Sequence, residues 1–344
     1  MTKQQHGAAG SAGSEPPRRV TLRDVAQAAG VSHQTVSRAI NDKGEIDPET
    51  RRRVLDAARE LRYRPSRFAR GLVRPDTITV GLIVQDVVNP FYPELMAGVI
   101  EAAENKGWQV VVGSTQNDRD NELALVRSLG RQVDALIGFL DHSDAELAPY
   151  VEGVPLVVMD RHQKTSHGVV DIDIETGVRH GIQHLVERGH QKIGMIDCLR
   201  EDGQSEDGLE RRDCFLAVVE ELGLPVDQTW IVAGTESVAG GEAGFAELRS
   251  KHPDVSAVFA YNDVVAIGAH RAARRLGLDV PKDCAVLGFD GLSIGELLDP
   301  PLTTVHIDKR RMGELAIDQV DGLLNGTPVE HALLPTELVV RGST

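Results

Sequence analysis

The chain has 344 residues, 41% of them hydrophobic, which suffices for ordinary globular cores in two or three domains. Its net charge of −15 argues, taken alone, against a nucleic-acid partner. No apolar run reaches the roughly 18 residues of a membrane-spanning helix, so we expect no membrane partner.

The amino-terminal tail and the cysteines bear on location. Residues 1–17 lack the apolar centre of a secretion signal, so we expect a disordered tail on a cytoplasmic protein. Cys198, Cys214 and Cys284 are odd in number and lack the paired spacing of a metal site. We therefore expect buried free thiols, no metal and no cofactor.

Charge is distributed very unevenly along the chain. Residues 1–75 carry 15 basic and 8 acidic side chains, a net of +7, so the remaining 269 residues carry 22 basic and 44 acidic, a net of −22. Contacts to DNA phosphates, which release counterions, require such a local excess of Lys and Arg. The alternative for a charged stretch is a merely solvated surface. The recurrent arginines from position 51 to 74 exceed what solubility needs, and they favour DNA contact.

The segment from Val20 to Asn41 predicts two short helices joined at a glycine. Apolar residues at helical spacing, among them Val25 and Ala29, form one stripe, and Gly30 supplies the turn. Ser32 is placed to cap the second helix. This is the pattern of a helix-turn-helix.

A third helix is expected to complete this head, which spans residues 18–64. Asp47 is placed as its N-cap and Pro48 at its first position, with Val54 and Ala58 in its buried stripe. Three small helices would share one core. The alternative is a helical hairpin without any role in nucleic-acid binding.

The outer face of the second helix carries side chains that can read base edges. Gln34 can pair with adenine and Arg38 with guanine through two hydrogen bonds in the major groove. The predicted base contacts are His33, Gln34, Ser37 and Arg38. Phosphate anchors, which set register without reading sequence, are predicted at Thr21, Ser32 and Thr35.

From Thr77 onward, short β-branched runs alternate with longer helical stretches, which indicates parallel βαβ units. The expected strands are TITVGLIV, WQVVVG, ALIGFL, PLVVMD, KIGMID, AVFAY and CAVLGF. The helices between them include PELMAGVIEAAENKG, NELALVRSLGRQ, GVRHGIQHLVERG and VAIGAHRAARRLG. Doubly wound folds bind ligands beyond the carboxyl ends of their strands, and polar residues follow most of these runs.

With head, basic connector and α/β body in this order, the chain closely resembles the lactose-repressor and galactose-repressor family of bacterial transcription regulators. The motifs that carry the likeness are VTLRDVAQAAGVSHQTVSRAIN, YRPSRFARGL, YNDVVAIGA, VLGFDG, PPLTTV and LPTELVVRGST. The resemblance implies that the second helix of the head reads the bases of an operator. It also implies a hinge over residues 65–76, in which Ala69 and Leu72 enter the minor groove.

The resemblance further implies a two-lobed effector domain over residues 77–341, with the type I fold of periplasmic binding proteins and doubly wound parallel sheets. Lobe one is expected over about 77–174 and 304–324, and lobe two over about 175–303 and 325–341. A small molecule between the lobes would control DNA affinity by binding two lobe arrangements unequally.

Residues matching the family's effector site suggest a sugar, because a guanidinium, an amide and a carboxylate together donate to and accept from hydroxyl groups. The matching residues are Arg211, Asn262 and Asp290, with Gln85, Asn89, Phe91, Asp141 and Arg161 as lesser candidates on lobe one. Asp263 is expected to cap a helix.

Two departures from the family pattern bear on this site. Cys214 stands where the family usually has glycine, so the backbone near Arg211 is expected to differ. No aromatic residue stands near Ala239 to stack on a sugar ring. A nucleobase, a phosphorylated metabolite and no effector at all therefore stay open.

Two other classes of function compete with a regulated DNA-binding protein. An enzyme is disfavoured because GxGxxG, GxxxxGK[ST] and GxSxG motifs are absent and the histidines lack metal-site spacing. An effector-independent DNA-binding protein would share the same head. One three-helix head contacts few base pairs, so we expect a homodimer on a near-palindromic site. The chain stops directly after the last expected strand, without a heptad tail that would join dimers into tetramers.

Overall fold

The structure, a computed structural model, describes residues 22–40, 46–61, 77–161, 165–198, 210–328 and 331–344. The chain forms two compact units, Met1–Asp76 and Thr77–Thr344. The predicted tail (1–17) and hinge (65–76) lie outside the described residues. Among the described helices, none combines the length and hydrophobicity that a bilayer span requires.

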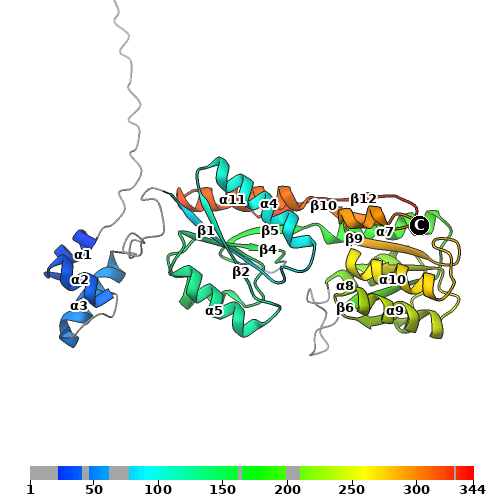
Figure 1. The fold of residues 1–344 in the computed structure, drawn as a ribbon, viewed down its shortest axis with the longest axis horizontal. Coiled ribbons are helices and arrows are strands. Elements are labelled where there is room, and N and C mark those ends of the chain that lie inside the picture. Colours follow the sequence, from blue (N-terminus) through cyan, green and yellow to red (C-terminus); the bar gives the residue numbers. More distant parts are fainter. Residues whose placement is uncertain (1–21, 41–45, 62–76, 162–164, 199–209, 329–330) are drawn as a thin grey trace, which may run out of the picture. The chain divides into compact units, whose positions relative to one another are not determined.

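The small unit contains the three expected helices, α1 (Leu22–Ala29), α2 (His33–Ile40) and α3 (Pro48–Glu60) (Figure 1). Gly30 lies between α1 and α2 with a φ of +64°, a conformation that glycine adopts without strain. The helices bury one shared core, as the helical spacing predicts: Val25, Ala26, Ala29, Val36, Ala39, Val54, Ala57 and Ala58.

Both predicted N-caps of the small unit are confirmed. The Ser32 hydroxyl accepts a hydrogen bond from the Thr35 amide at 3.1 Å, and the Asp47 carboxylate accepts one from the Thr50 amide at 2.9 Å. Each cap satisfies a backbone donor that the first helical turn leaves without a partner. Sequence-local chemistry therefore sets where α2 and α3 begin.

The large unit contains two six-stranded sheets, one in each lobe, which confirms the predicted fold class (Figure 1). The first sheet is parallel throughout, in the order β2-β1-β3-β4-β5-β11. Its strands are β1 (Thr79–Val84), β2 (Gln109–Ser114), β3 (Ala135–Gly138), β4 (Leu156–Met159), β5 (Gly168–Ile172) and β11 (Ala332–Leu334). The helices α4 (Phe91–Asn105) and α11 (Lys309–Leu324) pack together, as do α5 (Arg119–Gly130) and α6 (Asp144–Val151).

The second sheet repeats this order as β7-β6-β8-β9-β10-β12, with only β12 antiparallel to its neighbour. Its strands are β6 (Ile193–Cys198), β7 (Ile231–Gly234), β8 (Ala257–Ala260), β9 (Ala285–Asp290), β10 (Thr303–Ile307) and β12 (Thr336–Val339). The helix α7 (Ile174–Glu187) packs with α8 (Glu210–Glu221), and α9 (Val238–Lys251) packs with α10 (Asp263–Arg275). β1, β6 and β9 are buried along their whole length, as parallel strands covered on both faces are.

The chain passes between the lobes at Asp173, Asp308 and Pro335. The predicted positions of the second and third crossings, near Thr303 and Asn325, were wrong. β10 pairs with β9 and so completes the second sheet before the chain leaves that lobe. β11 pairs with β5 and so returns to the first sheet after α11. Strand pairing between distant segments, rather than local pattern, decides both positions.

Glycines let α9 and α10 pack with their backbones almost in contact. A Cβ atom at Gly241 would lie 2.1 Å from the Val265 carbonyl oxygen, and one at Gly268 would lie 2.2 Å from the Val238 carbonyl oxygen. Only glycine permits this approach. The close packing brings the amino-terminal ends of α9 and α10 side by side, and the loops before them carry side chains of the candidate site.

Candidate functional site

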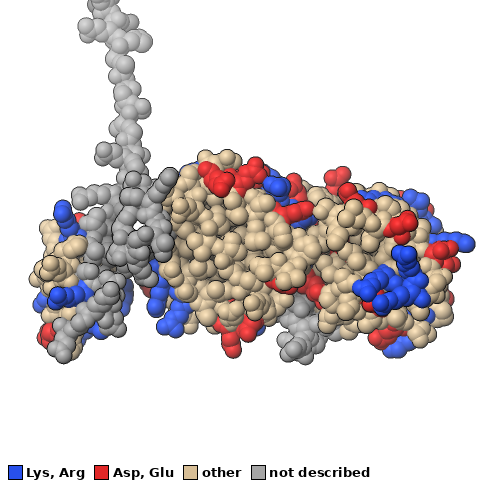
Figure 2. Space-filling model, viewed as in Figure 1, with Lys and Arg blue, Asp and Glu red and all other residues tan. Residues whose placement is uncertain are grey.

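The surface of α2 presents the side chains predicted to read DNA. His33, Gln34 and Arg38 are exposed, while Val36 and Ala39 of the same helix are buried in the core. Basic side chains lie on the small unit (Figure 2). Ser32 and Thr35 are joined by a hydroxyl hydrogen bond of 2.9 Å at the start of α2, where helix amides favour phosphate oxygens.

Several of the DNA-contact predictions cannot be placed. Thr21, Ala69 and Leu72 lie outside the described residues. Ser37 belongs to α2, but its side chain also lies outside the description. These four assignments stay predictions.

In the large unit, Tyr92, a buried residue of α4, lies within electrostatic range of carboxylates from both lobes. Burial raises the pKa of Tyr92 well above its usual range, and the charges of Glu236, Asp160, Asp290 and Asp141 raise it further. Asp141 and Asp160 follow β3 and β4 of lobe one, and Asp290 ends β9 of lobe two. The carboxyl ends of both sheets therefore meet here, where doubly wound folds bind ligands.

Arg211 is held in lobe two by aromatic rings and by a backbone carbonyl. Its guanidinium carbon lies 4.5 Å from the ring centres of both Tyr261 and Phe289. One nitrogen donates to the Tyr261 carbonyl at 3.0 Å, and another lies 3.8 Å from an oxygen of the Asp290 carboxylate. Arg211 and Asp290, both predicted from the sequence, are thus neighbours, and both are buried.

Two predicted amides also meet, through a residue that the sequence did not single out. The Glu236 Oε1 atom accepts hydrogen bonds from Asn262 Nδ2 at 2.8 Å and from Asn89 Nδ2 at 2.6 Å. Asn262 precedes α10 in lobe two, and Asn89 precedes α4 in lobe one. Glu236 lies in the loop between β7 and α9 of lobe two. Its carboxylate therefore joins the lobes.

The expectation that Asp263 caps α10 was wrong, because Asn262 is the N-cap and its side chain accepts from the Val265 amide at 3.0 Å. The fully buried Asp263 carboxylate instead accepts from the Leu292 amide and the Thr304 hydroxyl, both at 2.6 Å. Burial, and then the charge of Asp290, raises the pKa of Asp263 to about 8, although these hydrogen bonds and Lys309 oppose the rise.

This raised pKa predicts a pH dependence of stability. With a pKa of about 8 when folded and an ordinary value of 3.8, folded Asp263 keeps a proton that the unfolded chain releases. Asp263 therefore makes stability fall as pH rises through this window, by up to about 1.4 kcal/mol per pH unit. The variant Asp263→Asn cannot ionise. Its unfolding free energy should improve relative to wild type between pH 6 and pH 8.

Tryptophan fluorescence during urea unfolding measures this effect in the large unit alone, since both tryptophans, Trp108 and Trp230, belong to it. Parallel pH profiles of the two proteins would contradict the prediction. Parallel profiles between pH 6 and pH 8 would mean that Asp263 is already ionised in the folded protein.

Lys309, the first residue of α11, is fully buried and contacts residues of both lobes. Its ammonium donates to the carbonyls of Asp290 at 2.7 Å and Ile307 at 3.0 Å, and lies 3.2 Å from a carboxylate oxygen of Glu94 on α4. Asp290 has a φ of +107°, a conformation that costs a non-glycine residue about 1–3 kcal/mol. The hydrogen bond from Lys309 to its carbonyl helps to hold this strained turn in place.

The lesser predictions on lobe one fall into two groups. Gln85 accepts from the Tyr92 hydroxyl at 2.8 Å and so lies at the convergence. Phe91 is buried in an edge-to-face cluster with Tyr92 and Phe139. The Arg161 guanidinium instead lies 3.5 Å from the Asp144 carboxylate at the start of α6, in a separate polar group of lobe one.

The two departures from the family pattern, at Cys214 and near Ala239, lie in helices α8 and α9. Helix α8 runs without interruption through Arg211 and Cys214, and a backbone near Arg211 that differs from the family's stays a prediction. Ala239 lies in the first turn of α9, in the segment that packs closely on α10. Aromatic surface near the site comes from other residues, Tyr92, Tyr261 and Phe289.

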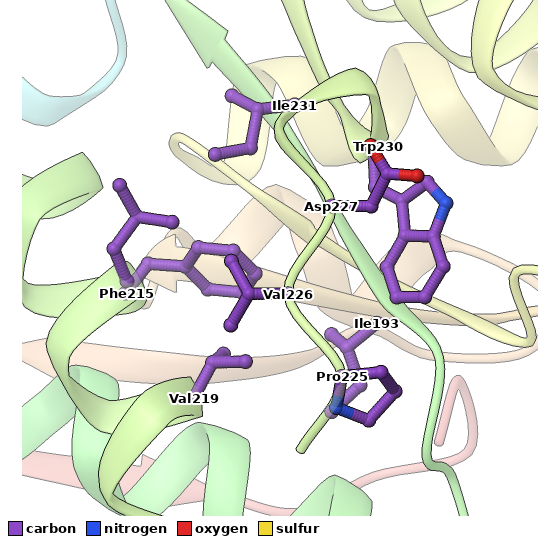
Figure 3. Close-up of a pocket in the computed structure, with 9 residues that line it drawn as sticks. Ile193, Phe215, Val219, Pro225, Val226, Asp227, Trp230 and Ile231 are labelled. Carbon is purple, nitrogen blue, oxygen red and sulfur yellow. The ribbon is translucent and has the colours of Figure 1, made fainter. Parts of the chain in front are cut away.

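Lobe two also has an apolar hollow, lined by residues that include Phe215, Val219 and Trp230 (Figure 3). It includes Ile193 and Ile231, the first residues of β6 and β7, and thus lies at the amino-terminal edge of the sheet. Ligands of doubly wound folds bind at the opposite edge. Its one charged lining residue, Asp227, already accepts from the amide and hydroxyl of Thr229. We do not place the effector there.

Sequence patterns found Arg211, Asn262 and Asp290 but missed Glu236 and Lys309. Glu236 lies just before α9, and Lys309 is the first residue of α11. Acidic and basic residues at such positions are usually exposed to solvent. No local signal separates them from exposed residues, because their partners lie far away in the chain.

Comparisons with known proteins agree with this architecture. A family model described as bacterial regulatory proteins, lacI family, matches residues 21–66, and one described as a periplasmic binding protein-like domain matches residues 182–344. The chain is 34% identical over 328 residues to the HTH-type transcriptional regulator GalS of Salmonella typhimurium, with 92% of this chain and 94% of that relative covered.

Solved structures give the same assignment over nearly the whole chain. A complex of the transcriptional regulator CelR with cellobiose matches with a TM-score of 0.70 and 31% identity, covering 95% of this chain and 100% of that one. A lac repressor dimer bound to operator and the anti-inducer ONPF matches with a TM-score of 0.70 and 28% identity, covering 95% and 99%. Head and lobes therefore follow one known arrangement, and the chain is a member of the lacI family of bacterial regulatory proteins.

Proposed function

We propose that the protein is a transcriptional repressor that binds a palindromic operator as a homodimer. In this proposal a small molecule, a sugar, binds between the lobes and controls DNA affinity. As a lacI-family member the chain is a DNA-binding regulator, and relatives of this similarity are named as regulators rather than as enzymes. Since its ligand would be chromosomal DNA, we place it in the cytoplasm.

One observation carries the proposal of a ligand between the lobes: polar residues of both lobes meet there, with Asn89 of lobe one and Asn262 of lobe two on the same carboxylate, while lobe two also presents Arg211 beside Asp290. A cation, amides and carboxylates close to aromatic rings suit the hydroxyl groups and apolar face of a sugar. CelR, matched above, is a complex with cellobiose. Switching repression from mostly on to mostly off takes about 5.5 kcal/mol of differential effector affinity for two lobe arrangements.

Exposed apolar residues support the homodimer. From the sequence we expect helix 90–106 and the segment 262–277 to supply apolar faces to the interface. Most apolar residues of α10 are buried within lobe two, but Leu276 directly after it is exposed, as is Ile100 on α4. Large hydrophobic side chains are also exposed at Val111 and Val112 on the edge strand β2, and at Leu297. The lac repressor structure matched above is a dimer on its operator.

The test of the DNA function is selection of bound duplexes from a random pool, followed by a metabolite screen for changes in the retained fraction. We expect adenine preference opposite Gln34 and guanine preference opposite Arg38. Each substitution, Gln34→Ala or Arg38→Ala, should cost about 1–3 kcal/mol of discrimination at its own base pair.

Arg59→Ala serves as the matched control, since Arg59 on α3 is exposed and paired with Asp56 at 3.1 Å. It should leave base preference unchanged. A protein that binds no duplex at low salt would refute the proposal. A protein that binds DNA but answers to no metabolite would support an effector-independent regulator.

A further inference from the structure

We propose that Glu236 is a positioning residue that latches the two lobes together in the absence of effector. The inference deepens the proposed function, on which it rests for its regulatory meaning. Its observation is the pair of hydrogen bonds that one carboxylate oxygen accepts, from Asn262 in its own lobe and from Asn89 in the other lobe. Asn89 and Glu236 are 147 residues apart in the chain.

The side chains of Asn89 and Asn262 are both oriented so that their NH₂ groups point toward Glu236. Asn262 Oδ1 accepts from the Val265 amide at 3.0 Å, so its nitrogen must face away from the start of α10. Asn89 Oδ1 accepts from the Phe91 amide at 3.0 Å, so its nitrogen likewise faces away from the start of α4. Each asparagine is thus fixed by a backbone donor of a different lobe, and the two nitrogens converge on the same oxygen.

The fold also holds Glu236 in a position from which it can reach both asparagines. The loop that carries it ends at Ser237, whose hydroxyl caps α9 by accepting from the Gly240 amide at 3.0 Å. Backbone contact between α9 and α10, which Gly241 and Gly268 allow, sets the distance between Glu236 and Asn262. Glu236 therefore belongs to lobe two, and its bond to Asn89 must break if the lobes separate at this point.

The latch acts on residues that the effector is proposed to use. Asn89 and Asn262 are occupied by Glu236 in this structure, so Glu236 presents both amides in fixed positions before any ligand arrives. Hydrogen bonds to a charged group contribute more than neutral ones, and losing such a bond shifts an equilibrium on the order of 10-fold to 100-fold. Removing the carboxylate should therefore move the effector-free protein toward separated lobes by that factor.

The experiment measures lobe separation in the effector-free, full-length protein by small-angle X-ray scattering, with hydrogen exchange of the Tyr92 amide, which donates to the backbone carbonyl of Asn89, as a local readout. Glu236→Ala and Asn89→Ala should each expand the large unit and speed exchange. The double variant should be no more open than either single one, because both remove the same bond. Glu236→Gln, which keeps an oxygen acceptor, should stay largely closed.

Glu247→Ala is the matched control. Glu247 lies on the same helix α9, is exposed and pairs with Lys251, so this variant should scatter like wild type. Unfolding midpoints should be close to wild type in every variant, which separates a latch from a loss of folding.

The proposal is overturned if Glu236→Ala scatters like wild type, if the effects of Glu236→Ala and Asn89→Ala simply add, or if Glu247→Ala opens the protein equally. It is also overturned if Glu236→Gln opens as far as Glu236→Ala, because charge rather than these hydrogen bonds would then act. No measurement involves effector or DNA. Failure to find an effector would refute the proposed control by a small molecule but would not affect the latch. Failure of the latch experiment would likewise leave the proposed function unaffected.

Discussion

Replacing Arg211 by alanine is expected to raise the effector concentration that changes DNA binding by on the order of 100-fold, since a lost hydrogen bond to a charged group costs about 1.5–3 kcal/mol. The effector is the metabolite that the screen identifies. Arg211 is held between Tyr261 and Phe289 and faces Asp290, so its removal leaves a buried carboxylate without its neighbouring cation. DNA affinity without effector should be unchanged, because Arg211 contacts Tyr261, Phe289 and Asp290 within its own lobe and the head is left intact.

Two further variants sharpen this test. Arg211→Lys keeps the charge but not the planar group that stacks between the rings, so it should restore only part of the response. Arg212→Ala changes the next residue of α8, whose guanidinium lies 3.8 Å from Asp197 instead of Asp290, and should respond normally. A normal response of Arg211→Ala would remove Arg211 from the effector site.

Replacing Lys309 by methionine is expected to destabilise the large unit by about 2–5 kcal/mol, because each buried acceptor left without a donor costs about 1–3 kcal/mol. The carbonyls of Asp290 and Ile307 would both lose the ammonium, and Glu94 would lose its ion pair. The strained turn at Asp290 would lose its restraint as well. Urea unfolding followed by tryptophan fluorescence measures this effect in the large unit alone.

Lys251→Met is the control for this variant. Lys251 is exposed on α9 and pairs with Glu247 four residues earlier, so its removal should cost less than about 1 kcal/mol. Equal losses in the two variants would mean that the buried ammonium contributes no more than a surface one. In that case the contacts between Lys309 and lobe two would be incidental to stability.

The sequence alone determined the features that depend on neighbours along the chain. Helix starts at Ser32 and Asp47, the turn at Gly30 and the apolar stripes of the head all follow from spacing within one or two helical turns. All seven predicted strands are present, and six of them, all except the edge strand β2, are buried parallel strands, which are continuous apolar runs. The strands β5, β7, β10 and β11 were not predicted, since their pairing partners rather than their composition make them strands.

Only the tertiary structure decided which polar residues are buried and which meet. Arg211, Asn262 and Asp290 were found from motifs, but the cross-lobe bond of Glu236 joins residues 147 positions apart. Lys309 has the sequence context of a solvent-facing lysine, and it is buried only because the turn at Asp290 and helix α4 close around it. The crossings at Asp308 and Pro335 likewise depend on which sheet accepts β10 and β11. Capping and periodicity act over a few residues, whereas burial and pairing depend on the whole folded chain.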